Sequence, residues 1–440
     1  MSLRHFLKFV VLLGGVVGAF SSGVMAATVS LGIDQLEKSN FSVLEGKRVG
    51  LVTNPSGIDS KGRSAITVLF QGQGSGKGYK LLKLFGPEHG IDGQTGAGKD
   101  VRDGRDRATR LPVFSLYGDT RRPTPKMLAG LDAMVYDVQD LGNRSYTFIS
   151  TLGYVMEECA KYNIEVIVLD RPNPLGGVRI EGPCLDPNVK SFVGLYDIPY
   201  VYGLTPGELA QWINAKYLAK PCRLTVVAMR GWTRKMVWED TGLRWVPTSP
   251  YIPTIGAVRG YTATGIIGEI GIETGLGTPY PFEAIAGSGW DAKGFAKRFN
   301  ALRIPGVVGV PYTYRAGGTY NGIYLKMDPR NAGNLTAINF QALEILRKTV
   351  SGFSPFARNS SDQIDMFKKV TGVAQLRSQL INGRPVVDIV RSWDSGVVRW
   401  AEERLPYLLY GNTPVRTEAA PPAASVSPPS TIAVTSEALP

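Results

Sequence analysis

Short apolar runs alternate with amphipathic segments along the first half of the chain. Five of these runs predict buried strands, at residues 47–53, 80–85, 112–116, 133–138 and 165–169. Between them, apolar positions recur at helical spacing around residues 64–71, 125–129 and 146–161. Apolar, β-branched strands that alternate with helices are typical of a parallel sheet covered on both faces. The pattern therefore predicts an α/β fold.

The pattern changes after about residue 230. Before that point, Thr205, Pro206 and Glu208 form a capping box that predicts a helix start, and residues 223–229 predict a further strand. Beyond it, tryptophan, proline and glycine become dense, with strands expected at 307–315 and 322–327 and helices at 335–350 and 362–370. We therefore expect a first domain at 27–229 and a second, smaller α/β domain at 230–412.

Both ends of the chain have compositions of their own. Arg4 and Lys8 precede an apolar run at residues 9–20, and Val24-Met25-Ala26 fits a cleavage site. We expect residues 1–26 to be an export signal, so that the mature chain is periplasmic or secreted and is not stably inserted in a membrane. Residues 413–440 are rich in Pro, Ala, Ser and Thr, which predicts a disordered tail.

Charge and rare residues narrow the range of partners. The chain has 49 Lys and Arg against 37 Asp and Glu, which suits an anionic partner such as a cell-wall polymer. No arginine-rich stripe with interleaved aromatics occurs, so we expect no nucleic acid partner. The two histidines are His5, in the predicted signal, and His89. A multi-histidine zinc site is thereby excluded, and we expect no metal and no organic cofactor.

With three cysteines, at least one thiol has no disulfide partner within the chain. A Cys184–Cys222 disulfide is possible, but the spacing of the cysteines does not support it. The sequence does not indicate an oligomeric state.

Polar clusters follow four of the predicted strands. Their members are Asn54 and Ser56; Glu88 and His89; Asp137, Gln139, Asp140, Arg144 and Tyr146; and Asp170, Arg171 and Asn173. Ligands of open α/β sheets bind at the carboxyl ends of the strands. We therefore expect these four clusters to converge on one functional site.

The residue types in these clusters suit acid–base chemistry on a sugar. Glu88, next to the rigid Pro87, is the candidate general acid, with His89 beside it. Glycoside hydrolysis also needs a second carboxylate, for which the candidates are Asp137, Asp140, Asp170 and Glu181.

The remaining candidates would bind the substrate. Arg144 and Arg171 could hold a substrate carboxylate or form internal salt bridges. Tyr146 and Tyr202 could bind a sugar or pack in the core. Local patterns leave these alternatives open.

Eight segments occur in an order that carries a resemblance: TNPSG (53–57), GPEHG (86–90), LPVFSLYG (111–118), DVQDLGNRSYTFISTL (137–152), LDRPNPLGG (169–177), EGP (181–183), SFVG (191–194) and LTPGELA (204–210). Over about residues 31–411 the chain resembles the NamZ-type exo-β-N-acetylmuramidases. The resemblance implies a Rossmann-like domain and a smaller α/β domain, with the active site in the cleft between them.

The resemblance also implies an activity and roles for individual residues. The activity would be release of N-acetylmuramic acid from the non-reducing end of peptidoglycan fragments, so that muramyl sugars are the expected partners. Glu88 would be the acid, and Asp140 or Asp170 would activate water or attack directly. His89 and Asn173 would orient the acid or the sugar, and Arg144 or Arg171 would hold the lactyl carboxylate.

The chain departs from the family pattern at four positions. Lys99 stands where the family usually has Glu, Tyr202 where it has His, Tyr251 where it has Asn, and Leu276 where it has Arg. Because these departures fall in the substrate-facing half of the pattern, two alternatives stay open. One is a non-catalytic protein that binds cell-wall sugars, and the other is a glycosidase of altered sugar specificity.

Overall fold

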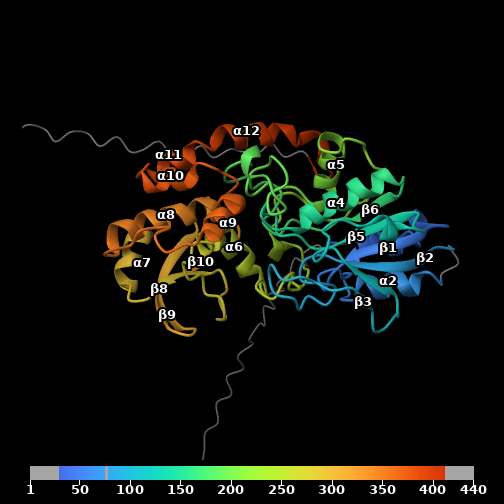
Figure 1. Cartoon of the computed structure of the whole chain (residues 1–440), viewed down its shortest axis with the longest axis horizontal. Helices are drawn as coiled ribbons and strands as arrows, with labels where there is room; N and C mark the ends of the chain where they lie inside the picture. Colours follow the sequence, from blue (N-terminus) through green and yellow to red (C-terminus); the bar gives the residue numbers. More distant parts are fainter. Residues whose placement is uncertain (1–28, 75–77, 412–440) are drawn as a thin grey trace, which may run out of the picture.

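Two lobes lie side by side in the computed structural model of the chain (Figure 1). The model describes residues 29–74 and 78–411. The predicted export signal at 1–26 and the predicted tail at 413–440 lie outside the described residues. Within the described part, no helix is long and apolar enough to cross a membrane.

The first lobe is built on a seven-stranded sheet of order β3-β4-β2-β1-β5-β6-β7. Every neighbouring pair is parallel except β3 and β4 at one edge. The strands are β1 (Arg48–Thr53), β2 (Lys80–Gly86), β3 (Gly104–Arg105), β4 (Pro112–Ser115), β5 (Ala133–Asp137), β6 (Glu165–Leu169) and β7 (Leu224–Val227). The predicted parallel-sheet α/β fold is confirmed.

Helices cover both faces of this sheet, as the buried strands require. They are α1 (Gly32–Lys38), α2 (Ala65–Gly72), α3 (Pro125–Leu128), α4 (Phe148–Lys161) and α5 (Pro206–Lys216). Successive residues of a strand point to opposite faces. Leu51 accordingly packs in a core with α1 and α2, whereas Val52 packs in a second core with α4 and α5.

The order of the strands fixes where a ligand would bind. The chain enters the sheet at its centre with β1, moves outward through β2 and β4, and then returns to the other side of β1 as β5. This reversal makes the carboxyl ends of β1 and β5 a topological switch point, the usual position of a ligand-binding crevice in such sheets.

The second lobe contains an antiparallel sheet of order β8-β10-β9. Its strands are β8 (Ala284–Gly287), β9 (Val307–Arg315) and β10 (Thr319–Met327). Its helices are α6 (Ile255–Gly268), α7 (Ala292–Asn300), α8 (Leu335–Thr349), α9 (Ser361–Thr371), α10 (Leu376–Ile381) and α11 (Val386–Arg391).

The last helix, α12 (Asp394–Glu403), ties the lobes together near α5 (Figure 1). From its end, Trp400 Nε1 donates to the carbonyl of Tyr202 at 2.8 Å, and Arg404 Nη1 donates to the carbonyl of Gly177 at 2.9 Å. One hydrophobic core runs from the α4 and α5 face of the large sheet into the second lobe. Cys159, Cys184 and Cys222 are all free thiols.

Candidate active site

Glu88 lies just beyond the end of β2, with both carboxylate oxygens held. Oε1 accepts a hydrogen bond from the backbone N–H of Gly98 at 2.9 Å, and Oε2 accepts one from Thr147 Oγ1 at 2.5 Å. Thr147 immediately precedes α4, so the rigid sheet and the helix start together position the carboxylate. Glu88 keeps 8% of its surface exposed, which leaves an edge that a ligand can reach.

His89 organises the loop that supplies one of those hydrogen bonds. Its backbone has φ of 71°, a left-handed conformation that non-glycine residues adopt only when their surroundings enforce it. Its Nδ1 lies 2.8 Å from the carbonyl of Thr95, and its ring packs edge-on against Phe148. The side chain therefore fixes the loop that leads to Gly98 and is a positioning group for Glu88.

An exposed guanidinium lies on the other side of Glu88. The Arg121 guanidinium stacks 4.9 Å from the ring centroid of Tyr117 and 4.7 Å from that of Phe192. Burial raises the pKa of Tyr117 to about 12, and its hydroxyl also interacts with Glu88, which raises the pKa, and with Arg121, which lowers it. The Tyr117 hydroxyl thus interacts both with the Arg121 guanidinium and with the candidate acid.

Arg121 has no carboxylate partner within residues 29–74 and 78–411, unlike its neighbour Arg122, which pairs with Glu157 and Glu158 at 2.9 and 3.0 Å. Arg121 was not among the predicted site residues. The available signal was its place after β4, the one of the first five predicted strands whose following segment received no candidate.

Asp140 follows β5 and is enclosed by the protein. Its Oδ2 accepts hydrogen bonds from the Tyr202 hydroxyl and, at 2.7 Å, from the N–H of Gly142. Its Oδ1 is buried and has no hydrogen-bond partner in the described part of the chain. Burial raises the pKa of Asp140 to about 7, although the hydrogen bonds from Tyr202 and from the backbone N–H groups of Gly142 and Leu141 lower it. A buried carboxylate with one unsatisfied oxygen is costly, and such sites are often functional.

Asp170 has a different environment, because both of its oxygens are satisfied. Oδ1 accepts from the N–H groups of Arg171 and Gly207, and Oδ2 accepts from the hydroxyls of Thr205 and Tyr410. Burial raises its pKa to about 7. The four bonds join β6 to the start of α5 and to the end of the second lobe, which is a structural role.

Tyr146 joins the segment after β5 to the second lobe. Its hydroxyl donates to Thr248 Oγ1 at 2.8 Å, and its ring packs edge-on against Tyr261 of α6. Burial raises the pKa of Tyr146 above its ordinary value, and the charges of Glu88 and Asp140 raise it further. The structure therefore brings Glu88, Asp140 and Tyr146 into one neighbourhood.

Neither predicted carboxylate-binding arginine is free to meet a ligand's carboxylate. Arg171 forms a buried two-pronged ion pair with Asp137, with distances of 2.6 and 2.8 Å. Arg144 is fully buried, and its guanidinium donates to the backbone carbonyls of Pro183, Ile198 and Thr371 at 2.7 to 2.8 Å. Arg144 therefore joins the first lobe to the end of α9.

We expect Arg144→Met to lower the free energy of unfolding by about 3 kcal/mol, because several buried carbonyls lose their donors. Denaturant unfolding followed by circular dichroism measures this. Arg330→Gln is the control, since Arg330 makes an exposed ion pair with Asp240 whose loss should cost less than about 1 kcal/mol. Equal costs for the two variants would contradict the structural role of Arg144.

The remaining predicted residues mostly order the loops. Asn173 bonds the backbone of Leu175 and Leu204, and Glu181 accepts from the N–H of Thr336 at the start of α8 and from Arg179. Asn54 accepts from Ser56, whose hydroxyl in turn accepts from the N–H of Gln139. This last chain of contacts connects the ends of β1 and β5.

Two of the four residues expected to depart from the family pattern lie beside the candidate carboxylates or their loops. Tyr202 bonds Asp140, as described above. Tyr251 lies against the loop that holds Glu88, because a Cβ placed on Gly96 would be 3.6 Å from its hydroxyl oxygen. Lys99 follows Gly98 and is exposed. Leu276 is exposed in the second lobe. Tyr202 therefore lies at Asp140 and Tyr251 at the loop of Glu88, and none of the four is a residue that bonds the Glu88 carboxylate.

Comparisons with known proteins cover almost the whole described chain. The family "Exo-beta-N-acetylmuramidase NamZ, N-terminal" matches residues 49–256, and its C-terminal counterpart matches residues 259–410. The peptidoglycan beta-N-acetylmuramidase NamZ of Bacillus subtilis (strain 168) is 37% identical over 393 residues, which cover 87% of this chain and 91% of that protein.

Two crystal structures of DUF1343 family proteins from Bacteroides fragilis NCTC 9343 are also similar. One is 39% identical with a TM-score of 0.80 and covers 87% of this chain and 99% of that chain. The other, at 24% identity and a TM-score of 0.66, covers 88% of this chain and 100% of that chain and shares the fold.

Proposed function

The chain belongs to the NamZ family of exo-β-N-acetylmuramidases, and from this premise we propose that it releases N-acetylmuramic acid from the non-reducing end of peptidoglycan fragments. The observation that carries the proposal is the fixed carboxylate of Glu88, with an unpaired guanidinium, Arg121, one hydroxyl away. Muramic acid differs from the other wall sugar by a lactyl carboxylate. The Arg121 guanidinium could bind this carboxylate while Glu88 acts as the acid.

In this proposal Glu88 protonates the oxygen of the leaving sugar, and Thr147 and the Gly98 N–H hold it in place for that transfer. Asp140 is the second carboxylate, because one of its oxygens has no partner whereas both oxygens of Asp170 are occupied. His89 positions Glu88 through the loop at 89–98. The export signal at 1–26 would place the mature chain in the periplasm or outside the cell, where its substrate is found.

The function is tested with residues 27–440 and two chromogenic substrates, para-nitrophenyl β-N-acetylmuramide and para-nitrophenyl β-N-acetylglucosaminide. We expect chromophore release from the first and little from the second. Release from neither, together with binding of muramyl sugars, would favour the non-catalytic alternative. Preferential cleavage of the glucosaminide would favour altered specificity, which the departures at Lys99, Tyr202, Tyr251 and Leu276 keep open.

We expect Arg121→Gln to weaken binding of N-acetylmuramic acid by about 10- to 100-fold, because a charge-assisted hydrogen bond to the lactyl carboxylate is lost. Binding of N-acetylglucosamine should not change. Isothermal titration calorimetry measures both affinities.

The matched control is Arg122→Gln, since Arg122 is next in sequence but stacks 3.7 Å from the Tyr154 ring and pairs with two glutamates. It should leave both affinities unchanged. Equal weakening of the two sugars by Arg121→Gln would show that Arg121 does not recognise the carboxylate.

A further inference from the structure

The antiparallel sheet of the second lobe has one face in the core and one face open. Residues directly opposite each other in such a sheet share a face. Ile285, Ile323 and Leu325 lie on the inner face and pack in the main core with Phe295 and Phe299 of α7. The residues that alternate with them along each strand point to the other side.

That other side gathers five tyrosines, which we call the tyrosine face: Tyr312 and Tyr314 of β9, Tyr320 and Tyr324 of β10, and Tyr280 of the turn before β8. Neighbouring ring centroids among them lie 4.7 to 6.4 Å apart, so the rings form one continuous surface. On the same side, β8 contributes the small residues Ala284 and Ala286.

Solvent reaches the tyrosine face. Tyr280 is 40% exposed, and Val308 and Val310, which share this side of β9, are 49% and 42% exposed. The small apolar cluster around Tyr314 consists of residues of the sheet and of its β9–β10 turn alone, so no helix contributes a side chain to it. A continuous apolar surface that is left open to water marks an interaction site.

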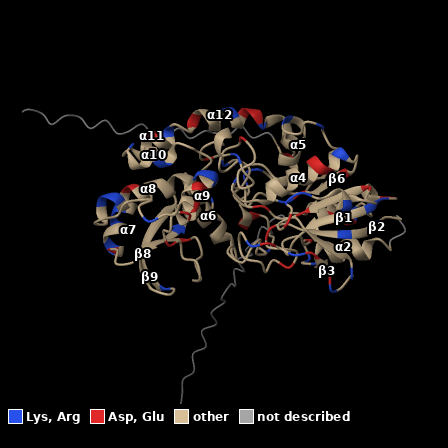
Figure 2. Ribbon diagram, viewed as in Figure 1, with Lys and Arg blue, Asp and Glu red and all other residues tan. Residues whose placement is uncertain are grey.

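The tyrosine face carries little charge. The charged residues of the three strands are Arg315, which alternates to the other side, and Lys326 near the end of β10, and β8 and β9 are largely tan in Figure 2. Glu283, which accepts a hydrogen bond from the Tyr324 hydroxyl at 3.4 Å, is only 8% exposed. An uncharged ligand therefore suits this surface better than an anion or a nucleic acid.

The chemistry of tyrosine narrows the class of ligand to sugars. A β-linked pyranose ring presents apolar C–H groups on its flat faces and hydroxyl groups around its edge. A tyrosine ring has the matching combination, because its face is apolar and its hydroxyl is a donor and acceptor at the rim. A row of such rings can stack on successive sugars of a ribbon-like, β-1,4-linked glycan.

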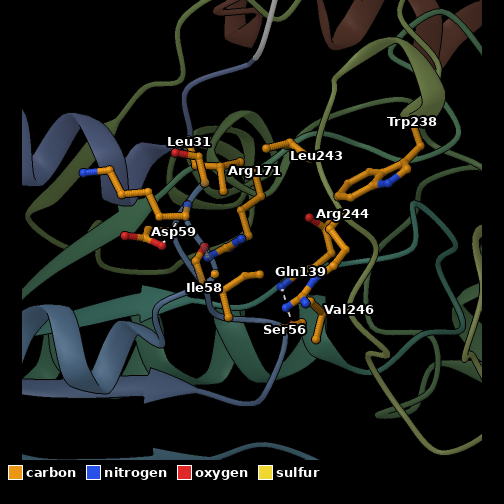
Figure 3. Close-up of a pocket in the computed structure, with 13 residues that line it drawn as sticks. Leu31, Ser56, Ile58, Asp59, Gln139, Arg171, Trp238, Leu243, Arg244 and Val246 are labelled. Carbon is orange, nitrogen blue, oxygen red and sulfur yellow. Dashed lines mark hydrogen bonds between the residues drawn. The ribbon is translucent and has the colours of Figure 1, made fainter.

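The crevice at the carboxyl ends of β1, β5 and β6 has a different character (Figure 3). Its volume is about 320 Å³, and its lining contains one aromatic residue, Trp238, together with the charged Asp59, Lys61, Arg171 and Arg244. A small, charged crevice does not suit a chain of neutral sugars, whereas the tyrosine face does.

A second copy of the chain is a poorer match for the same sheet. β9 lies at the edge of the order β8-β10-β9, where another strand could add to the sheet. Pro311 lies in the middle of β9 and has no N–H to donate, and proline in an edge strand is a feature that counteracts such pairing.

The tyrosine face is connected to the site of the acid through a series of packed rings. Two residues after Tyr280, the Phe282 ring lies 5.2 Å from that of Tyr261, which in turn lies 6.0 Å from that of Tyr146. Tyr146 belongs to the neighbourhood of Glu88 described above. A polymer bound on the tyrosine face would therefore be held to the same rigid part of the molecule as the candidate active site.

We propose that the tyrosine face binds the β-1,4-linked glycan backbone of peptidoglycan by stacking on its sugar rings, as a binding site additional to the one around Glu88. The choice of an N-acetylhexosamine chain rests on the proposed function, whereas the stacking surface does not. Such a site keeps the protein on the polymer while the acid acts at a chain end.

The test is calorimetric binding of chitohexaose, a neutral β-1,4-linked chain of N-acetylglucosamine, to residues 27–440. We expect the wild type to bind it, and Tyr280→Ala combined with Tyr312→Ala to weaken binding by about 10-fold or more, because two stacking rings are lost. Tyr162→Ala is the control, since Tyr162 is 48% exposed at the end of α4 in the first lobe, and it should keep the wild-type affinity. Circular dichroism verifies the fold of each variant, and Tyr280→Ala alone, at an exposed turn, should already weaken binding.

Three results would overturn the inference. They are a wild type that does not bind chitohexaose, an unchanged affinity in both tyrosine variants, and a wild-type dimer in analytical ultracentrifugation that the double variant dissociates, which would make the face a contact between copies. Chitohexaose contains no muramic acid, so its binding does not depend on the proposed hydrolysis. Absence of chromophore release with intact, Tyr280-dependent binding of chitohexaose would contradict the proposed activity alone.

Discussion

Glu88→Gln should lower kcat for release of para-nitrophenol from para-nitrophenyl β-N-acetylmuramide by about 1,000-fold, within the range of general acid catalysis. The amide cannot donate a proton to a leaving group. It can still accept the hydrogen bond from Gly98 and contact Thr147, so the local structure should persist. Initial rates at saturating substrate measure the effect, and circular dichroism verifies the fold.

Glu344→Gln is the control for this variant, because Glu344 makes an exposed pair with Lys348 on α8, far in sequence from the site. It should keep the wild-type kcat. A Glu88→Gln protein that hydrolyses at the wild-type rate would remove Glu88 from the reaction.

The hydrophobic pattern predicted the first lobe well, because buried parallel strands leave an unmistakable apolar run. It failed in parts of the second lobe for physical reasons. Helix α6 (IGAVRGYTATGIIG) is buried on nearly all sides and rich in glycine and threonine, so it lacks an amphipathic stripe. Strand β8 (AIAG) is four residues long, and three of them are small, so it is too short and too weakly β-branched to stand out.

The rule that ligands bind at strand ends placed Glu88 and Asp140 together, but it could not assign the arginines. Arg144 and Arg171 follow strands just as a ligand-binding residue would, yet both point inward, to carbonyls and to Asp137. Their partners lie 34 or more residues away, and local spacing carries no information on such contacts. Arg121 was missed for the converse reason: its aromatic neighbours come together only in the fold.

Asp140→Asn should remove a pH dependence from the stability of the protein. The pKa of Asp140 is raised from 3.8 to about 7 by burial, so the folded state binds its proton more tightly than the unfolded state does. This contribution to stability is fully present below the unfolded pKa and is lost as the pH rises through the folded pKa. Between about pH 5 and pH 8.5 the free energy of unfolding of the wild type should fall by about 3 kcal/mol relative to that of the variant.

Urea unfolding of the wild type and the variant at both pH values measures their unfolding free energies. Subtracting one from the other at each pH cancels the contributions of other buried groups such as Asp170. Asparagine can retain the bonds from Tyr202 and Gly142 through its oxygen and place its amide where the unpartnered Oδ1 lies, so the variant should fold. A difference in unfolding free energy that is the same at both pH values would show that Asp140 is ionised throughout.

The same variant decides whether Asp140 takes part in the reaction. As the second carboxylate, Asp140 activates water or attacks the sugar, and neither is open to an amide, so kcat should fall by about 100-fold or more. The rates are compared near pH 8, where the pKa of about 7 leaves the Asp140 carboxyl mostly ionised, and circular dichroism at the same pH verifies that both proteins are folded. An unchanged kcat there would leave Asp140 as a buried structural acid, because the unpartnered oxygen would then serve no step of hydrolysis.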